Sequence, residues 1–194
     1  MKFSRHLIPL FTIGSAEFYP FHVTKYIREK VRLQVELSPF RFSGQYAGLI
    51  ATEWSSLWEK YYLPPRSIAH DGLIVDIGAG EGETAIFYMK HGYTNFRLVE
   101  PASLPFLSFN VEILRRYGCR VDAKYRSAKN EDMVSASFIK MDCEGCEMGL
   151  IADYPKDVPS VIEVHSNDAA SKYAMLGFRP VKKVAQEVYL MRNF

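Results

Sequence analysis

The sequence has few cysteines, little net charge and no long apolar run, and each shortage excludes a class of protein. Three cysteines in 194 residues are too few for a disulfide-held scaffold and are typical of a reducing compartment. The formal net charge of +2 gives no electrostatic reason to expect nucleic acid as a partner. No stretch reaches the ~18 uninterrupted apolar residues of a membrane span. We therefore expect a cytoplasmic protein with no nucleic-acid partner and no firm membrane signal.

The first residues weakly resemble a secretion signal. A basic start precedes the apolar run Leu7–Ile13, and small residues follow it. His6 and Pro9 interrupt this pattern, so we expect no cleavage.

The composition predicts a globular protein, with 48% hydrophobic and 24% charged residues. Regular alternation of strands and helices begins only after Pro64-Pro65. We therefore predict an aromatic-rich N-terminal extension or cap at 1–65 and a second domain at 66–194. Within the extension, Val23–Val35 is compatible with a helix, but its end overlaps a run that alternates like a strand.

The segment Gln45–Leu63 is predicted to form an amphipathic helix, because its apolar residues recur at spacings of three and four. Two interpretations of this apolar stripe remain open. It packs on the following domain, or its tryptophans, Trp54 and Trp58, line a substrate pocket.

The rest of the chain predicts an α/β fold. The expected strands are 73–77, 95–99, 119–124, 137–141, 160–165, 178–184 and 187–191. The first five are separated mostly by helices, expected at about 81–91, 103–117 and 145–152, the second of which is capped by Ser103 and closed by Gly118. This alternation indicates a parallel sheet covered on both faces. The last two have no helix between them and predict an antiparallel hairpin. We expect a doubly wound, Rossmann-like, mostly parallel seven-stranded sheet with a C-terminal antiparallel hairpin and a mainly helical N-terminal extension.

A glycine-rich turn at 78–82 follows the first expected strand and opens a helix. Its glycines let the backbone approach a ligand closely. Glu83 stands where a dinucleotide-binding fingerprint has its third glycine. The carboxylates of Asp76, Glu81 and Glu83 would repel a pyrophosphate, but they suit a ligand that carries a sulfonium and an ammonium.

Glu100 ends the next strand, where a carboxylate can accept hydrogen bonds from both hydroxyls of a ribose. We infer that the cofactor is S-adenosylmethionine. The alternatives are a glycine turn whose acids only cap a helix, a nicotinamide-dependent oxidoreductase, and a non-catalytic Rossmann-like module that binds a partner.

Four segments resemble the FkbM-type methyltransferases: VDIGAGEG at 75–82, LVEP at 98–101, FIKMDCEGCE at 138–147 and VIEVH at 161–165. The most specific is the run from Lys140 to Glu147, with lysine, aspartate, glutamate, glycine and glutamate at its fixed positions. The resemblance extends from about Gln45 to the C-terminus. It implies a class I S-adenosylmethionine-dependent methyltransferase, with O-methylation of sugars or secondary metabolites as the associated activity.

The resemblance also implies which residues bind the cofactor. Asp76, Gly78 and Gly80 would line its methionine part, and Glu100 its ribose. The full predicted set is Asp76, Gly78, Ala79, Gly80, Glu81, Glu100, Pro101 and Asp142. Family members often carry asparagine where this chain has Gly80. The segment 124–136 is short and has no clear helix, so the sequence leaves the adenine contacts open.

Acidic residues follow the fourth expected strand, and His165 ends the fifth. Methyl transfer to a hydroxyl benefits from a base that removes its proton, and histidine titrates in a suitable range. We predict His165, Asp142 and Glu144 as the catalytic residues and a small hydroxylated acceptor (a sugar, glycan or secondary metabolite). Helix capping is the alternative for Glu144 and Glu147. The oligomeric state is not predicted.

Two further readings concern metals and thiols. Asp142 with Asn167 and Asp168 resembles the layout of magnesium-dependent catechol-type O-methyltransferases, whose oxygen ligands suit that ion, but we expect no metal. Cys143 and Cys146 form a C-x-x-C motif, which also occurs in thiol oxidoreductases. Because flanking acids oppose a reactive thiolate, we expect two buried packing thiols.

Overall fold

The computed structural model describes residues 11–13, 16–18, 37 and 39–194. Strands β1 (Phe11–Ile13) and β2 (Ala16–Phe18) form an antiparallel pair. The apolar run that begins at Leu7 is described only from residue 11, and the possible helix at 23–35 lies outside the described residues. Within the described ranges, no helix is long and apolar enough to span a membrane.

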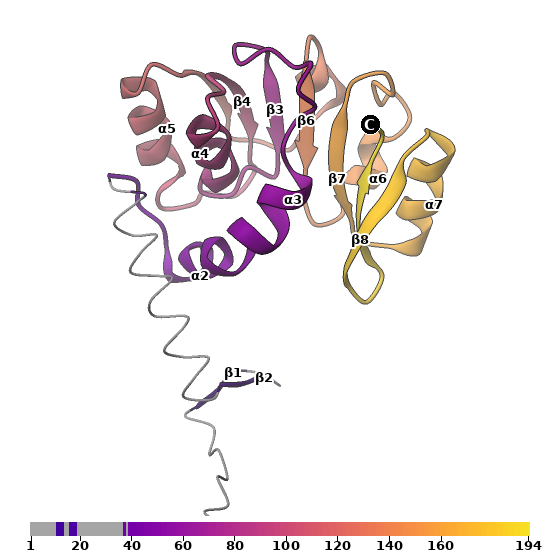
Figure 1. Cartoon of the computed structure of the whole chain (residues 1–194), viewed down its shortest axis with the longest axis horizontal. Coiled ribbons are helices and arrows are strands. Elements are labelled where there is room, and N and C mark those ends of the chain that lie inside the picture. Colours follow the sequence, from indigo (N-terminus) through magenta and orange to yellow (C-terminus); the bar gives the residue numbers. More distant parts are fainter. Residues whose placement is uncertain (1–10, 14–15, 19–36, 38) are drawn as a thin grey trace, which may run out of the picture.

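The centre of the molecule is a seven-stranded sheet (Figure 1). Its strands are β3 (Ile74–Ile77), β4 (Asn95–Val99), β5 (Arg120–Lys124), β6 (Phe138–Met141), β7 (Ser160–Val164), β8 (Arg179–Ala185) and β9 (Val188–Arg192). The order is β5-β4-β3-β6-β7-β9-β8, and only β9 runs antiparallel to its neighbours. The predicted doubly wound sheet with a closing hairpin is confirmed. The order reverses between β3 and β6, and ligands bind at such a switch point.

Helices cover both faces of the sheet. They are α2 (Gly44–Glu53), α3 (Glu59–Tyr61), α4 (Glu83–Lys90), α5 (Leu107–Arg116), α6 (Glu147–Leu150) and α7 (Asn167–Met175), with a π-helical turn η1 (Trp54–Trp58) and a 3₁₀ turn η2 (Asn130–Met133). The start of α5 differs from the expected one: the segment from Ser103 is not yet helical, and Phe106 holds the N-cap position. Gly118, at φ +85°, follows its end as predicted.

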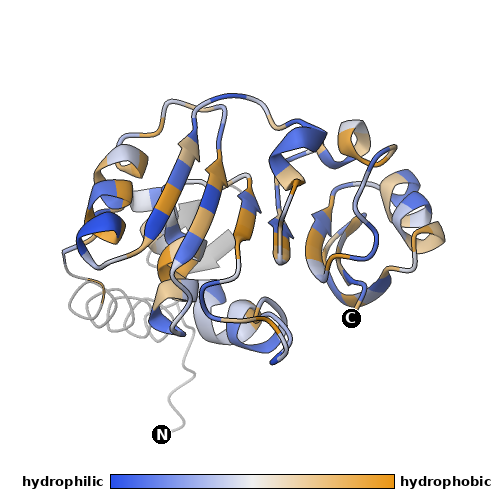
Figure 2. Ribbon diagram, turned by 90° about the horizontal axis from the view of Figure 1, so that it is seen from above, coloured by the Kyte–Doolittle hydropathy of each residue, from blue (hydrophilic) through white to orange (hydrophobic). Residues whose placement is uncertain are grey.

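The core has two parts, one on each face of the sheet. One contains the apolar residues of α2, η1, α4 and α5, and the other those of α6 and α7. In Figure 2, orange apolar positions recur along the strands among blue polar ones, and the flanking helices likewise carry both colours. The predicted helix at 45–63 is formed by α2, η1 and α3 together. The ring of Trp54 packs edge-on against the ring of Phe87 of α4, with 5.1 Å between the ring centres. Residues on both sides of Pro64 therefore share one core.

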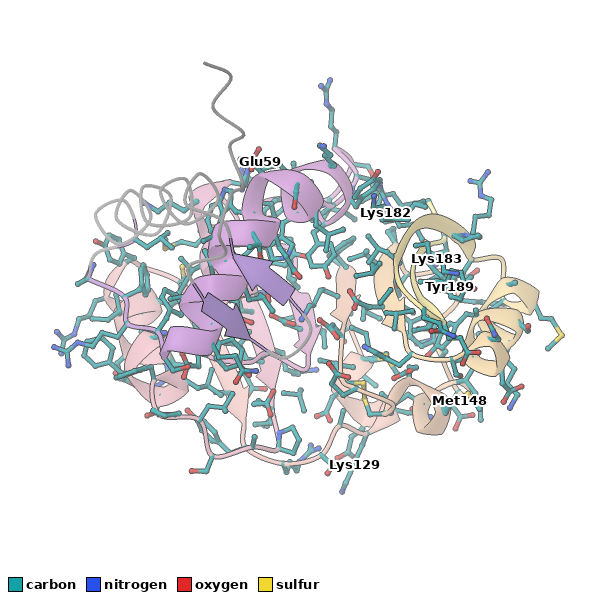
Figure 3. All side chains as sticks on the ribbon, turned by 90° about the horizontal axis from the view of Figure 1, so that it is seen from below. Glu59, Lys129, Met148, Lys182, Lys183 and Tyr189 are labelled. Carbon is teal, nitrogen blue, oxygen red and sulfur yellow. A yellow bond between two sulfur atoms is a disulfide. The ribbon has the colours of Figure 1, made fainter. Side chains whose placement is uncertain are left out.

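The exposed edge of the sheet is β8, in which every residue is exposed. Lys182 and Lys183 project from this strand (Figure 3), and the Lys183 ammonium lies 5.6 Å from the centre of the Tyr189 ring. Lysines on an edge strand hinder pairing with another strand. The closing hairpin therefore ends the sheet rather than extending it.

Candidate functional site

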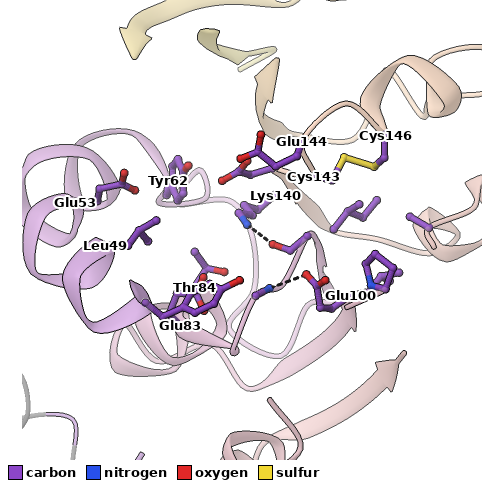
Figure 4. Close-up of a pocket in the computed structure, with 18 of the residues that line it drawn as sticks. Leu49, Glu53, Tyr62, Glu83, Thr84, Glu100, Lys140, Cys143, Glu144 and Cys146 are labelled. Atoms are coloured by element: carbon purple, nitrogen blue, oxygen red, sulfur yellow. Dashed lines mark hydrogen bonds between the residues drawn. A yellow bond between two sulfur atoms is a disulfide. The ribbon is translucent and has the colours of Figure 1, made fainter. Parts of the chain in front are cut away.

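A cavity of about 370 Å³ opens at the carboxyl ends of β3, β4 and β6, beneath α2. This volume lies in the range of small-molecule sites. In the close-up, Leu49 and Glu53 of α2 face the loop that carries Cys143 and Glu144 (Figure 4). The cavity occupies the switch point of the sheet, where the topology predicts a ligand.

The predicted cofactor residues divide into two groups. Those that line the cavity are Gly78, Gly80, Glu100, Pro101 and Asp142. Asp76, Ala79 and Glu81 have no exposed surface and do not line it. Because these three residues are buried behind the cavity wall, they do not border the cavity in this structure, and their predicted part in binding the cofactor stays a prediction.

Asp76 supports the wall from behind. Its carboxylate pairs with the ammonium of Lys140 at 3.1 Å and accepts a hydrogen bond from the Thr84 hydroxyl. Lys140 also donates to the carbonyl of Gly78 at 2.9 Å. Burial lowers the pKa of Lys140, but the carboxylates around it, Asp76 above all, outweigh burial and hold that pKa above its usual value. Asp76 thus holds the ammonium of Lys140 in place, and that ammonium in turn holds the Gly78 carbonyl of the glycine turn.

The turn requires glycine at two positions. Gly78 has φ +73°, and a Cβ there would lie 1.7 Å from the carbonyl oxygen of Asp142. Gly80 has φ +57°, and a Cβ there would lie 2.5 Å from the Glu83 carboxylate and 2.7 Å from the Tyr46 ring. The space that an asparagine side chain would need at Gly80 is therefore filled by Tyr46 and Glu83.

Glu81 connects the turn to the chain that enters α2. Its carboxylate accepts a hydrogen bond from the backbone N–H of Ser43 at 2.8 Å. The side-chain amide of Asn110 donates to the backbone carbonyls of Glu81 and Arg41 at 2.8 and 2.7 Å. Glu81, a predicted cofactor residue, thus links two segments of the wall in this structure.

Glu83 and Tyr46 line the cavity beside Gly80. Glu83 accepts a hydrogen bond from the N–H of Glu81 at 2.9 Å, and burial raises the pKa of Glu83 to about 8. Burial, followed by the charges of Glu83 and Glu100, raises the pKa of Tyr46 to about 12. The sequence interpretation missed Tyr46. Its helical spacing with Leu49 and Glu53 is the signal that could have revealed it, since all three lie on the face of α2 that borders the cavity.

Glu100 lies where the prediction placed it, at the end of β4. It accepts hydrogen bonds from the backbone N–H of Gly80 at 3.1 Å and of Ala102 at 2.8 Å, one on each oxygen. A carboxylate has further lone pairs, so it can still accept hydrogen bonds from a ligand. Ser127 and Ala128 of the segment 124–136 also line the cavity.

The loop after β6 holds a disulfide that the sequence analysis did not predict. Cys143 and Cys146, expected to be packing thiols, are joined, and both line the cavity. The buried carboxylate of Glu147 accepts hydrogen bonds from the N–H groups of Gly145 at 2.8 Å and His165 at 2.9 Å. Helix capping, the alternative for Glu147, does not describe this bonding, because neither N–H group belongs to the first turn of α6. Glu144 is 86% exposed.

His165 is surrounded by carboxylates. Its Nε2 lies 3.7 Å from Asp142 and 3.6 Å from Glu144, so the three predicted catalytic residues do come together. Its Nδ1 lies 3.4 Å from Glu147. Glu147 first, and then Asp142 and Glu144, raise the pKa of His165 to about 9. In this arrangement the imidazole keeps its proton at neutral pH, contrary to the ordinary titration range that was expected for a base.

Two carboxylates near the site were not among the predicted site residues. Glu163 of β7 lies 3.8 Å from His165 Nε2, and Glu53 of α2 lines the cavity. Burial, followed by the charges of Asp142 and Glu53, raises the pKa of Glu163 to about 7. Alternation along VIEVH places Glu163 and His165 on one face of the strand, which is the signal that was available.

Asn167 and Asp168, the alternative partners of Asp142 in a metal site, are bound elsewhere. Asn167 accepts a hydrogen bond from the Tyr189 hydroxyl at 3.1 Å. Asp168 pairs with Lys172 at 2.8 Å along α7. The structure therefore does not assemble the magnesium layout that the sequence analysis had considered.

Comparisons with known proteins identify the fold. No protein-family model matches the chain, and no curated protein matches it. The PH0226 protein of Pyrococcus horikoshii OT3 is similar over 77% of this chain and 91% of its own, with a TM-score of 0.51 and 10% identity. The C-terminal domain of precorrin-6Y C5,15-methyltransferase from Rhodobacter capsulatus is similar over 80% and 94%, with a TM-score of 0.50 and 14% identity. The chain has a Rossmann-like methyltransferase fold.

A third similar structure is the O-methyltransferase NcsB1 of neocarzinostatin biosynthesis, in complex with S-adenosylmethionine and 2-hydroxy-5-methyl naphthoic acid. Its TM-score is 0.50 at 9% identity, over 76% of this chain and 55% of that one. At such identities the likeness is one of fold, and it confirms the fold class predicted from the sequence.

Proposed function

We propose that this chain is an S-adenosylmethionine-dependent methyltransferase, similar to the FkbM type, that methylates an oxygen of a small hydroxylated acceptor such as a sugar, glycan or secondary metabolite. The observation that carries the proposal is the cavity at the switch point of a methyltransferase fold. Among the described residues that line it, the acids Glu53, Glu83, Glu100, Asp142 and Glu144 face one lysine, Lys140. That lysine already pairs with Asp76. The unbalanced negative charge suits a cationic nucleoside and opposes a pyrophosphate.

The residues at the glycine turn fit the cofactor. The missing side chains of Gly78 and Gly80 let the turn lie directly against Asp142, Glu83 and Tyr46, since a Cβ at either position would collide with these neighbours. Glu83 supplies a carboxylate for the ammonium group, and Glu100 supplies one for the ribose hydroxyls. When bound, the cofactor supplies an electrophilic methyl group. Asp76, Ala79 and Glu81 act by holding the turn in place.

The acceptor would lie toward Asp142, in the half of the cavity bordered by Glu53, Trp58 and Tyr62. Transfer forms an oxygen–methyl bond, breaks the sulfur–methyl bond and releases the hydroxyl proton. Asp142 and Glu144 are the carboxylates positioned to take this proton, with His165 beside them as the third catalytic residue. Most of the rate would come from alignment of the acceptor oxygen with the methyl group.

Isothermal titration calorimetry with S-adenosylmethionine tests the proposal. We expect one site with a Kd below ~1 mM and a loss of at least about tenfold in Glu100→Gln, because ribose recognition loses a charged acceptor. Glu112→Gln, an exposed acid on α5, is the matched control and keeps the wild-type affinity.

Two results would overturn the proposal. One is tight binding of reduced nicotinamide cofactor together with no response to S-adenosylmethionine, which favours an oxidoreductase. The other is no response to either cofactor from folded protein, which favours a partner-binding module.

A further inference from the structure

The ends of β6 and β7 bring together a mixed set of metal-ligating side chains. Asp142, Glu163 and His165 each present one ligand atom, and these atoms lie within 4.8 Å of one another. His165 Nε2 is 3.7 Å from Asp142 and 3.8 Å from Glu163. One imidazole and two carboxylates, fixed on adjacent parallel strands, form a donor set that first-row divalent cations accept.

The imidazole of His165 is oriented by a buried acid. Glu147 is 1% exposed, its carboxylate is held by two backbone N–H groups, and it lies 3.4 Å from His165 Nδ1. A carboxylate on the far nitrogen favours the tautomer whose Nε2 lone pair is free. Nε2 then faces the carboxylates of Asp142 and Glu163, so a divalent cation that displaces the Nε2 proton would be held by all three groups.

The charges around this cluster are poorly balanced. Neither Asp142 nor Glu163 forms an ion pair with a described lysine or arginine, and Glu53 adds a third nearby carboxylate. Lys140 acts on Glu163 only at a distance, because its ammonium is bound to Asp76 and to the Gly78 carbonyl. A divalent cation would neutralise the cluster without any rearrangement of the glycine turn.

We propose that Asp142, Glu163 and His165 bind a divalent first-row transition-metal cation, with Glu147 as the positioning residue for His165. Around a metal at ~2.0–2.2 Å from its ligands, neighbouring ligand atoms lie about 3.0–3.5 Å apart. The two His165 separations of 3.7 and 3.8 Å would close by a few tenths of an ångström, and all three ligand atoms already lie within 4.8 Å of one another. The ligand set differs from the Asn167 and Asp168 layout and departs from the expectation of no metal. The site rests on this geometry and not on the proposed methyl transfer.

Metal binding to the full chain, without cofactor, tests this inference. The probes are Mn²⁺, followed by electron paramagnetic resonance, and Zn²⁺, followed by calorimetry at pH 7.5. We expect one site per chain and a Tm that rises with metal concentration. Glu163→Gln and His165→Ala each weaken binding at least about tenfold, and Glu147→Gln weakens it about 10- to 100-fold by loss of orientation.

Three controls make the result decisive. Asp168→Asn, in the acid that was the alternative ligand, keeps wild-type metal affinity. The double variant Cys143→Ser/Cys146→Ser also keeps it, and Zn²⁺ binding lost in that variant would assign the metal to the thiols and overturn the proposal. S-adenosylmethionine binding by Glu163→Gln, measured in the same preparation, separates failure of this site from failure of the proposed function.

Two outcomes overturn the metal site. The first is no stoichiometric binding of either cation by folded wild-type protein at 1 mM metal, a weak limit in affinity terms. In that case His165 in its protonated form is itself the cation of the cluster. The second is binding that persists unchanged in both Glu163→Gln and His165→Ala.

Discussion

The two ends of the cavity are both acidic, but their carboxylates are satisfied in different ways. At the glycine-turn end, Glu83 and Glu100 accept hydrogen bonds from backbone N–H groups. At the other end, Asp142 lines the cavity and, like Glu163 outside the lining, faces the imidazole of His165. Among the described residues, neither carboxylate accepts a hydrogen bond from a backbone N–H. The first end is organised before any ligand arrives. At the second end, within the described part of the chain, these carboxylates are paired only with the single imidazole of His165 or with a bound cation.

The largest effect on stability is expected from a substitution in the glycine turn, at Gly78, which lies against the backbone of Asp142. Gly78→Ala places a Cβ 1.7 Å from the Asp142 carbonyl oxygen and strains a φ of +73°. We expect a loss of about 3 kcal/mol or more in the free energy of unfolding, measured by urea denaturation. Gly149→Ala is the control, because a Cβ there meets nothing within 4 Å and alanine favours the helix. Equal stability of Gly78→Ala and wild type would contradict this close approach.

The pH dependence of stability sharpens the comparison at the turn end. The folded pKa of Glu83 is about 8, above its ordinary value of 4.5, so folded protein binds this proton more tightly than unfolded protein does. The resulting stabilisation is complete below pH 4.5 and is lost as pH rises through about 8. In wild type, this proton makes the free energy of unfolding fall by on the order of a few kcal/mol between pH 4.5 and about 8. We expect urea denaturation of Glu83→Gln to show no such fall. A variant with the wild-type slope between pH 5 and 8 would refute the assignment.

Cofactor binding gives a second test at Glu83, under the proposed function. Pairing with an ammonium requires the ionised carboxylate, so affinity for S-adenosylmethionine rises with pH by at most about tenfold per unit and levels off near 8. Glu83→Gln flattens this profile. A wild-type affinity that falls over the same range would exclude the pairing.

The disulfide stabilises the acidic end. Because Cys143 and Cys146 are close in sequence, the loop they close is short. Reduction, or the double variant Cys143→Ser/Cys146→Ser, is expected to cost about 2 kcal/mol in thermal or urea unfolding. Cys119→Ser, at the unpaired buried cysteine, is the comparison variant, and dithiothreitol has no effect on the stability of the double variant.

The smallest effect on stability is expected from a substitution at Thr84, whose hydroxyl bonds to the buried carboxylate of Asp76. Thr84→Val removes the hydroxyl that donates to Asp76 while the ion pair with Lys140 remains. We expect a loss of about 1–2 kcal/mol in the free energy of unfolding, because a buried carboxylate loses one donor. Thr52→Val, whose hydroxyl bonds only to carbonyls of its own exposed helix turn, is the control. A larger loss for Thr52→Val than for Thr84→Val would contradict the role given to Asp76.

Local patterns predicted the sheet well. Asn95–Val99 was predicted to the residue, since apolar runs between turn signals are read from adjacent residues. The start of α5 was wrong because Ser103 has the chemistry of a cap, but the backbone becomes helical only after Phe106. Whether Pro64-Pro65 bounds two domains stays a prediction.

The site was harder to predict, because its charges are defined by partners far away in the sequence. The motif placed Asp76 in the wall, but its burial depends on Lys140, which lies 64 positions later (140 − 76) on a neighbouring strand. The altered pKa of His165 likewise comes from distant carboxylates, Glu147 at the start of α6 and Asp142 and Glu144 in the loop after β6. Sequence spacing identifies which strand end carries a group. It does not show what faces that group across the sheet.

The hydrogen bonds that Glu81 and Asn110 make to the backbone of Ser43 and Arg41 have a consequence for truncation. These hydrogen bonds join the segment just before α2, the helix that borders one side of the cavity, to the glycine turn and to α5. Shortening the protein from its N-terminus past Ser43 would therefore loosen the glycine turn before it exposed any strand of the sheet. The residues just ahead of the first long helix belong, in mechanical terms, to the binding site.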